Sequence, residues 1–150
     1  AFSGLTIHKL PPLVITRDSQ TIRVEAESAY TLLEPFIPLP AKDASNDTLL
    51  IVPAGKDKGK GAAFYKVNIP ATGIYEISVK AWWADGCSNS VEVSINEQVR
   101  QLSSEVFREH HFVKSQKAVQ LEAGEADLAL HCLENNIRID FIELRRLDHD

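Results

Sequence analysis

The chain has 150 residues, of which 44% are hydrophobic and 25% are charged, and its formal net charge is -5. This length and composition are typical of one folded domain and argue against a disordered chain. The mildly acidic balance argues against a nucleic-acid-binding protein, and no apolar run approaches the roughly 18 residues of a membrane span, so we expect neither partner. The sequence starts at Ala1 and has no methionine, which we interpret as a processed or excised piece of a longer protein.

The first twenty residues differ from the rest. Residues 1–20 show no clean alternation of apolar and polar side chains and include Pro11-Pro12, so we interpret them as a linker or the tail of a preceding domain. Residues 21–150 then form the folded module. Within it, residues 34–61 are irregular, with four prolines and a run rich in glycine and lysine. A connection this long in a compact domain is usually functional or mobile.

Short runs that alternate apolar and polar residues dominate from residue 65 onward. They cover residues 65–69, 75–81, 91–95, 119–121, 128–130 and 137–141. Each run is bounded by turn residues, and no segment keeps a helical period for more than two turns. Short strands with regular turn signals predict an all-β fold, namely an antiparallel β-sandwich of the jelly-roll type.

Two acidic residues near the start of the module, Glu25 and Glu27, are two positions apart. In a strand they share one face, and Asp140 near the other end points away from the face of Ile139 and Phe141. If the first and last strands are neighbours, three carboxylates converge, which suits the six to eight oxygen ligands of a calcium ion. The residues alone leave two alternatives, the solvated face of an edge strand and a catalytic carboxylate pair.

The dipeptide Trp82-Trp83 follows the strand expected at residues 75–81. If the alternation continues, Trp83 points into the core and Trp82 faces outward, at the rim of the sandwich, because Asp85-Gly86 marks a turn. An exposed indole near asparagine side chains suits a sugar ring, whose apolar face stacks on aromatic rings. The alternative is that both tryptophans are packing residues.

Several motifs, in a fixed order, resemble those of non-catalytic carbohydrate-binding modules of families six and thirty-five. They are residues 24–28 (VEAES), 63–77 (AFYKVNIPATGIYEI), 90–96 (SVEVSIN), 121–124 (LEAG) and 137–144 (IRIDFIEL). The resemblance implies a β-sandwich jelly roll that accompanies the catalytic domain of a secreted polysaccharide-degrading enzyme. It also implies a structural calcium ion held by Glu25, Glu27 and Asp140.

The resemblance further implies a sugar site at a loop end, built from aromatic side chains and an asparagine just before the last strand. The residues that we expect to contact the ligand are Tyr30, Trp82, Asn89, Asn135 and Asn136. Before Tyr65, where the family often has tryptophan, this chain has Phe64. Family thirty-five also binds uronic acids with help from a cation, and Lys56, Lys58 and Lys60 would favour an acidic polysaccharide. The alternative for these lysines is a solvated loop.

The two cysteines, Cys87 and Cys132, lie near the same loop end of the implied sandwich. A disulfide between them would brace the binding loops, which secretion allows. The alternative is that both are small buried hydrophobic residues. The spacing does not decide between the two, because a disulfide needs Cα atoms within about 7 Å.

We therefore predict a secreted, monomeric, non-catalytic carbohydrate-binding module with one structural calcium ion. Its partners would be a polysaccharide or oligosaccharide and the catalytic domain of the same parent chain, which the module would concentrate on its substrate. Two other classes stay open. One is a catalytic lyase or glycoside hydrolase domain, against which the lack of an acid–base constellation counts. The other is a structural or protein-interaction module without sugar affinity.

Overall fold

The structure is a computed structural model, and it describes residues 5–7, 14–18, 21–33, 36–42, 44–52, 61–84, 89–132 and 137–147. For residues 5–7 and 14–18, and for Asn89 and Cys132, it describes the backbone only. The strands are β1 (Leu5–Ile7), β2 (Val14–Asp18), β3 (Thr21–Glu25), β4 (Thr31–Leu33), β5 (Ile37–Pro40), β6 (Thr48–Val52), β7 (Ala62–Ile69), β8 (Gly73–Trp83), β9 (Asn89–Ile95), β10 (Gln98–Ser104), β11 (His111–Lys114), β12 (Val119–Leu121), β13 (Gly124–Cys132) and β14 (Ile137–Arg146). The helical elements in these ranges are two short 3-10 turns, η1 (Ala26–Ser28) and η2 (Ser45–Asp47). No helix among the described residues has the length and apolar character to cross a membrane.

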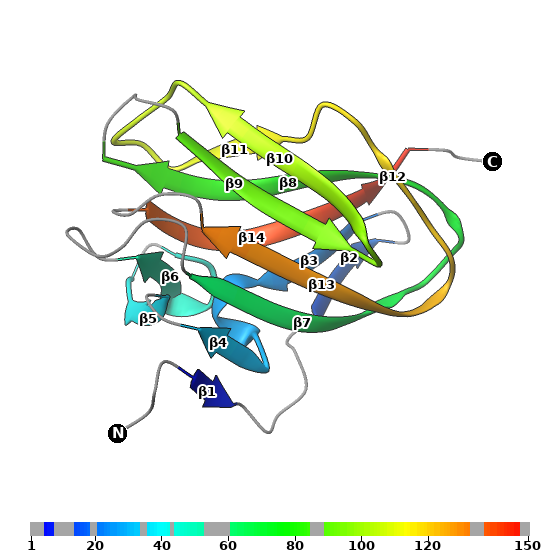
Figure 1. Ribbon diagram of the computed structural model, residues 1–150, viewed down its shortest axis with the longest axis horizontal. Coiled ribbons are helices and arrows are strands. Elements are labelled where there is room, and N and C mark those ends of the chain that lie inside the picture. Colours follow the sequence, from blue (N-terminus) through cyan, green and yellow to red (C-terminus); the bar gives the residue numbers. More distant parts are fainter. Residues whose placement is uncertain are drawn as a thin grey trace.

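The strands form two antiparallel sheets (Figure 1). In the described part of the chain, the six-stranded sheet has the order β1-β4-β7-β13-β9-β10. The eight-stranded sheet has the order β11-β8-β14-β3-β2, with β12 beside β8, β6 beside β14 and β5 beside β6. Strands β1 and β2 fall within residues 1–20, which we interpreted as a linker or tail, and they pair with β4 and β3. The arrangement confirms the predicted all-β antiparallel sandwich.

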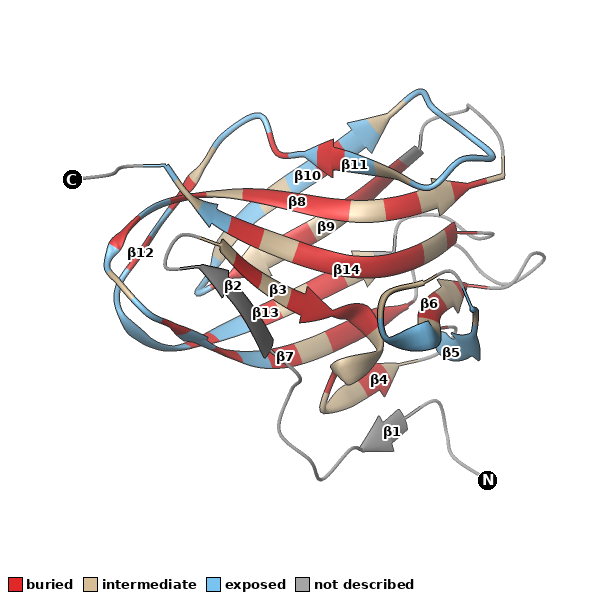
Figure 2. Cartoon of the chain, turned by 180° about the vertical axis from the view of Figure 1, so that it is seen from behind, coloured by how far each residue is buried: buried red, intermediate tan, exposed pale blue. Residues whose placement is uncertain are grey.

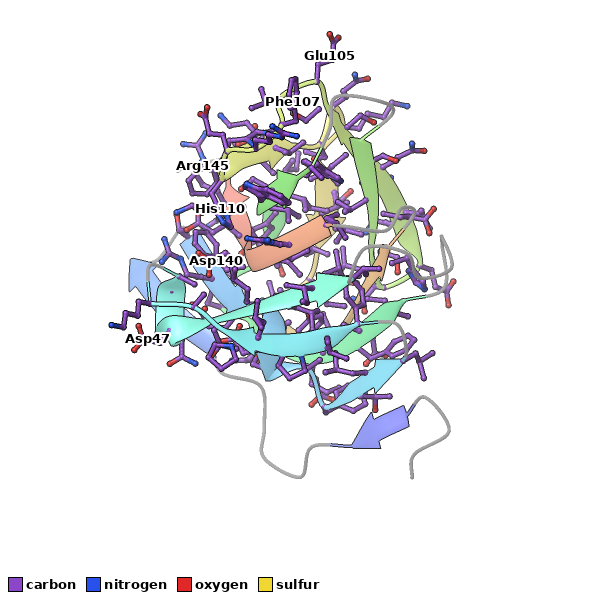
Figure 3. The ribbon with its side chains drawn as sticks, turned by 90° about the vertical axis from the view of Figure 1, so that its left-hand side faces the viewer. Asp47, Glu105, Phe107, His110, Asp140 and Arg145 are labelled. Carbon is purple, nitrogen blue, oxygen red and sulfur yellow. The ribbon has the colours of Figure 1, made fainter. Side chains whose placement is uncertain are left out.

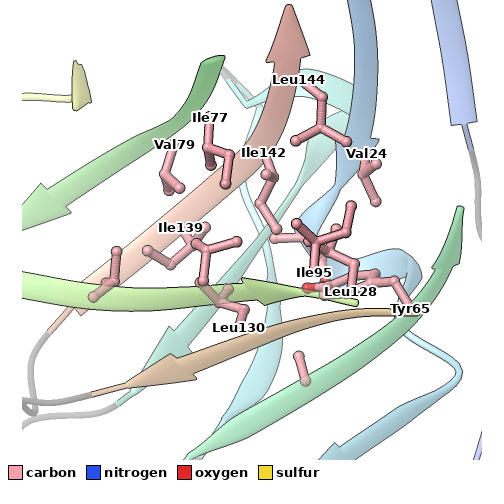
Figure 4. Packing of buried hydrophobic residues seen from close by; sticks show 14 of the residues in the cluster. Val24, Tyr65, Ile77, Val79, Ile95, Leu128, Leu130, Ile139, Ile142 and Leu144 are labelled. Carbon is pink, nitrogen blue, oxygen red and sulfur yellow. The ribbon is translucent and has the colours of Figure 1, made fainter. Parts of the chain in front are cut away.

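The hydrophobic core lies between the two sheets (Figure 4). Along β7, buried residues alternate with more exposed ones, as expected for a strand with one apolar face (Figure 2). Tyr65 of the six-stranded sheet and Ile77 and Val79 of the eight-stranded sheet belong to one buried cluster. Each fully buried valine or isoleucine stabilises the fold by about 1.5–3 kcal/mol relative to an exposed one.

Strand β14 departs from simple alternation at one point. Its pairing with β8 shifts between Ile139 and Phe141, which inserts one extra residue as a β-bulge. Ile139 and Ile142 both belong to the core cluster, so Asp140 and Phe141 lie between them, outside that cluster. The prediction that Phe141 shares the face of Ile139 is therefore wrong. The guanidinium of Arg23 lies 3.8 Å from the centroid of the Phe141 ring, on the outer face of the eight-stranded sheet.

The first strand of the module ends earlier than predicted. Strand β3 ends at Glu25 and η1 follows it, so Glu25 and Glu27 do not share one strand. The Ser28 hydroxyl donates to the carbonyl of Glu25 (2.6 Å), and the Tyr65 hydroxyl donates to the carbonyl of Ala26 (2.6 Å). Because Tyr65 belongs to the other sheet, a contact across the core fixes the position of this turn.

Candidate functional site

Three carboxylates lie near one another where β3 and β14 are neighbours. Glu25 ends β3, Glu27 lies in η1, and Asp140 is at the bulge of β14. Glu25 pairs in register with Phe141, which follows Asp140 directly. Glu25 and Asp140 are almost fully buried, with 0% and 2% of their surface exposed. The first and last strands of the module therefore bring these acidic side chains together.

The turn η2 supplies hydrogen bonds to all three carboxylates. The Ser45 hydroxyl donates to Glu25 Oε2 (2.6 Å), and the Ser45 backbone N–H donates to both oxygens of Asp140 (3.0 and 3.2 Å). The Asn46 side-chain amide donates to Glu27 Oε2 (3.0 Å). Asn46 has φ 56°, a left-handed conformation that asparagine adopts more readily than most residues. The conformation of η2 thus places two donor residues against the acidic cluster.

These hydrogen bonds leave part of the cluster unsatisfied. Glu25 Oε1 and Glu27 Oε1 are buried and have no hydrogen-bond partner among the residues that the structure describes. Burial raises the pKa of Glu25, Glu27 and Asp140, and with the added repulsion of Glu25 and Asp140 the pKa of Glu27 rises to about 7. Buried carboxylates are costly unless a proton or a cation joins them. Among the described residues, however, no group of three histidine, cysteine, aspartate or glutamate side chains is already spaced to hold a metal ion.

A pocket of about 500 Å³ lies on the outer face of the six-stranded sheet. Phe64, Ala129 and Ser94 stand directly opposite one another on β7, β13 and β9. The small side chain of Ala129 leaves a hollow between the Phe64 ring and Ser94. Tyr30 also lines the pocket, and its backbone N–H donates to the carbonyl of Phe64 (2.9 Å). The remaining polar side chains of the lining are Asn96, Glu97 and Asp127.

The groups that line this pocket are held in place by their neighbours. The ring of His131 packs edge-on against Phe64, with 6.1 Å between the ring centroids. The side-chain oxygen of Asn96 accepts the backbone N–H of Asp127 (3.0 Å), and the Asp127 carboxylate accepts from Lys66 Nζ (2.6 Å). A fixed aromatic wall beside a few fixed polar groups is typical of pockets for small ligands.

A second pocket, of about 380 Å³, lies on the outer face of the eight-stranded sheet. Lys80 of β8, Arg138 and Asp140 of β14, His110 before β11 and Lys42 between β5 and β6 all line it. Figure 3 labels two of these residues, His110 and Asp140, which lie near each other. Burial lowers the pKa of His110; the Asp140 carboxylate raises it, and the charges of Lys80 and Arg138 lower it.

Trp82 lies on the same outer face as this second pocket. The Arg138 guanidinium stacks on its indole, 4.2 Å from the ring centroid, and the two residues pair in register. Trp83, by contrast, is 1% exposed in the core, as the alternation predicted. Tyr30 leads into β4 of the six-stranded sheet, whereas Trp82 is in β8 of the eight-stranded sheet. The structure therefore does not bring these two predicted ligand contacts into one pocket.

Other positions of the sequence prediction lie outside the described residues or are described by their backbone alone. The positions outside the described residues are Lys56, Lys58, Lys60, Cys87, Asn135 and Asn136. The side chains of Asn89 and Cys132 are not described either, although both residues are in strands. The asparagine contacts, the acidic-polysaccharide role of the lysines and the disulfide stay predictions.

Sequence reasoning also missed residues that the structure places at these sites. Ser45 and Asn46 lie in the irregular segment 34–61, whose length was the one signal that it has a role. Lys80 and Arg138 sit at outward-facing strand positions next to Trp82, one on the same strand and one across from it. The alternation gives their face, but only the pairing of β8 with β14 brings them together.

No protein-family model and no curated protein matches this sequence. Solved structures do resemble the fold. The C-terminal family six module (CBM6) of LamC, a marine laminarinase from Zobellia galactanivorans, has a TM-score of 0.64 at 18% identity, over 84% of this chain and 99% of that one. A CBM6 from Cellvibrio mixtus lichenase 5A, in complex with cellotriose, has a TM-score of 0.66 at 16% identity, over 91% of this chain and all of that one (100%). The Podospora anserina GH26-CBM35 β-(1,4)-mannanase has a TM-score of 0.65 at 16% identity, over 89% of this chain and 29% of that one.

These similarities confirm the predicted resemblance to carbohydrate-binding modules of families six and thirty-five. At identities of 16–18% they show a shared fold. One fold can carry unrelated functions, so the ligand of this chain has to be argued from its own pockets.

Proposed function

We propose that the chain is a non-catalytic carbohydrate-binding module. The observation that carries this proposal is the pocket on the six-stranded sheet, where the aromatic residues Tyr30 and Phe64 stand beside the polar residues Ser94 and Asn96. A sugar ring has apolar C–H faces that pack on aromatic rings, and hydroxyl groups that need donors and acceptors at fixed positions. The fold similarity to carbohydrate-binding modules supports the same conclusion.

The pocket would bind one face of a sugar ring on Phe64, with the hydroxyl groups directed to Asn96 and Asp127. Packing on the half-exposed ring removes apolar surface from water, at about 25 cal/mol per Å². One shallow site of this kind binds weakly, but a catalytic domain on the same chain then meets its substrate at a raised local concentration. We expect a secreted parent protein and a monomeric module. Asn89, Asn135 and Asn136 are proposed contacts of a second, loop-end part of the sugar site.

A structural calcium ion is part of the proposal, because its preferred ligands fit the acidic cluster. Glu25 Oε1 and Glu27 Oε1 are buried acceptors without a partner in the described part of the chain, and calcium prefers carboxylate oxygens. Glu25, Glu27 and Asp140 would hold the ion, which supplies the positive charge that the cluster lacks. Ser45 and Asn46 keep the remaining oxygens of these carboxylates oriented.

Replacing Phe64 by alanine tests the sugar pocket. We expect Phe64→Ala to bind its polysaccharide about tenfold more weakly, and Tyr30→Ala to weaken binding in the same direction, because each change removes an aromatic anchor. The measurement is affinity electrophoresis in gels that contain β-1,3-glucan, β-1,4-glucan, mannan, xylan or galactan. Phe107→Ala is the matched control, since it removes a phenyl ring that is 50% exposed in the β10–β11 connection, away from the pocket.

Three results would count against the proposal. If Phe64→Ala and wild type are retarded equally, the pocket is not the sugar site. If no polymer retards the wild type, the chain does not bind these polysaccharides. If the isolated chain releases new sugar ends from any polymer, the non-catalytic part of the proposal is wrong.

A further inference from the structure

The pocket on the eight-stranded sheet has a different chemistry from the pocket around Phe64. Three basic side chains, Lys42, Lys80 and Arg138, line it together with one carboxylate, that of Asp140. They come from three separate parts of the chain, namely the β5–β6 connection, β8 and β14. Concave surfaces in which one sign of charge predominates focus the electrostatic potential and attract ions of the opposite sign.

Two of these positive charges are held against aromatic rings. The Arg138 guanidinium lies 4.2 Å from the Trp82 ring centroid, and Lys80 Nζ lies 5.8 Å from that of Phe141. Such contacts limit the freedom of long side chains without neutralising their charge. Within the described ranges, neither Lys80 nor Arg138 forms an ion pair, although both line the same pocket.

Arg23 on the same outer face provides a contrast. It also lies against the Phe141 ring, at 3.8 Å, but its guanidinium pairs with the Glu143 carboxylate at 2.9 Å. The sheet therefore neutralises one stacked cation and leaves two others facing a hollow. Since no ion pair among the described residues neutralises Lys80 or Arg138, their charges are available to an anion that enters the hollow.

We propose that this pocket binds an oxyanion, a sulfate ester or a carboxylate, carried on a sugar chain. Arg138 presents a planar fork of donors that matches an oxyanion in a bidentate geometry, and Lys80 and Lys42 add two point charges. Asp140, whose oxygens both accept the Ser45 N–H, is the one carboxylate among the described lining residues, and the three basic side chains outnumber it. Trp82 is a positioning residue that holds the Arg138 guanidinium in place.

This site is separate from the proposed sugar pocket, which lies on the outer face of the other sheet. It also differs in ligand, because the pocket around Phe64 has a polar lining of amide, hydroxyl and carboxylate groups. Loss of binding at one pocket should therefore not change binding at the other. Variants of Arg138 test the pocket on the eight-stranded sheet, and variants of Phe64 test the sugar pocket.

The test compares three polymers that share one backbone: dextran, carboxymethyl-dextran and dextran sulfate. In affinity electrophoresis at low salt, we expect at least one charged polymer to retard the wild type more than plain dextran does. The stronger of the two identifies the oxyanion as carboxylate or sulfate. Arg138→Gln and Lys80→Gln should each weaken this added retardation about tenfold, because each removes a charge-assisted contact. Lys42→Gln, in another element, should weaken it in the same direction.

Lys114→Gln is the matched control. Lys114 lies on β11 of the same sheet with its side chain 62% exposed, near Glu76 and outside the lining of this pocket. Its replacement changes the net charge by the same amount, so we expect at most a twofold effect. Trp82→Ala should weaken binding and Trp82→Phe should restore most of it, whereas a merely structural tryptophan would show its effect in the melting temperature alone.

The results that overturn the proposal are specific. They are equal retardation of the wild type by all three dextrans, equal losses in Lys114→Gln and Arg138→Gln, or full retardation of Arg138→Gln with an unchanged melting temperature. Equal losses would show a response to overall charge and not to a built pocket.

Discussion

At the scale of single residues, the surroundings of Glu27 oppose the charged form of its own carboxylate. Its Oε1 is buried beside two other carboxylates, and no described residue donates a hydrogen bond to it. Burial and this repulsion raise the pKa of Glu27 to about 7, so near neutral pH the side chain is divided between its protonated and charged forms. Only the charged form is a ligand for a hard cation, because metal ligands must be deprotonated. Glu27 is therefore the residue at which the two explanations of the cluster, proton or calcium, differ most.

Glu27→Gln should change stability in opposite directions in chelator and in calcium. In chelator near pH 7.5, the variant should melt at or above the wild-type temperature, because it removes a buried charge. In calcium at about 100 times the dissociation constant, the wild type should gain about 2.7 kcal/mol, or about 5 to 10 °C, and the variant should lose most of this gain. Differential scanning fluorimetry with titrated calcium measures both effects.

The control for this prediction is Glu122→Gln, which removes one carboxylate from the exposed turn before β13. It should keep the full stabilisation by calcium. If wild type and Glu27→Gln show the same shift in saturating calcium, Glu27 is not a ligand. If calcium shifts neither protein, the cluster is not a calcium site.

At the scale of secondary structure elements, alternation predicts those strands that bury one face. Strands β7, β8, β9 and β12 follow the pattern because their inward residues form the core. Alternation does not predict strands β10 and β11, since most of their residues are exposed or half-exposed and neither face is strongly apolar. Alternation also does not predict the end of β3 at Glu25 or the bulge at Asp140. These features depend on contacts across the core and between neighbouring strands.

For the candidate sites, too, alternation predicts which way a strand residue faces and no more. A period of two was enough to predict that the side chains of Glu25 and Asp140 point away from the core. That their strands are neighbours was only a condition of the argument from the residues. It could not supply Ser45 and Asn46, whose positions depend on the path of an irregular segment. The pairing order of the strands, which no local pattern encodes, places Tyr30 and Trp82 on different sheets.

The contact between Tyr65 and η1 tests how one element positions another. Tyr65 is fully buried, and its hydroxyl donates to the Ala26 carbonyl, between the two glutamates. Tyr65→Phe should reduce the free energy of unfolding by about 1–2 kcal/mol, since it removes a buried hydrogen bond. It should also weaken calcium binding, because the turn that carries Glu27 loses its anchor.

Tyr75→Phe is the matched control for this change. The Tyr75 side chain is also fully buried, and its hydroxyl donates to the carbonyl of Ala71 at 2.5 Å, far along β8 from η1. Urea denaturation should show a comparable loss for both variants, whereas calorimetric titration with calcium should separate them. Equal calcium affinities for Tyr65→Phe and wild type would show that η1 holds its shape without this contact.

At the scale of the whole molecule, the net charge conceals the distribution of charge. The chain carries -5 overall, yet Lys42, Lys80 and Arg138 line one pocket. A net charge is a sum over all faces, and it argues against an extended basic surface such as nucleic acid requires. It does not exclude a single oxyanion site, because three cations can be offset by carboxylates elsewhere on the surface.

The acidic cluster should also determine how the stability of the whole molecule depends on pH. The pKa values of Glu25, Glu27 and Asp140 are all raised by burial in the folded chain, that of Glu27 to about 7. Between about pH 4.5 and 7 the folded state then binds more protons than the unfolded state, so the stability of the metal-free protein should fall as the pH rises through this window.

Other groups titrate in the same range, and the comparison with Glu27→Gln removes them. The pKa of His110 is lowered mainly by burial, so His110 acts in the opposite sense, but it is present in both proteins. In chelator, the stability of wild type relative to Glu27→Gln should fall by on the order of 2 kcal/mol between pH 5 and 8, as measured by urea denaturation. In saturating calcium the same difference should rise with pH, because the ion binds the charged carboxylate and competes with the proton. If the stability difference between wild type and Glu27→Gln does not change with pH in chelator, Glu27 titrates alike in the folded and unfolded chains. If that difference falls with pH in calcium, the proton, and not the metal, satisfies the cluster.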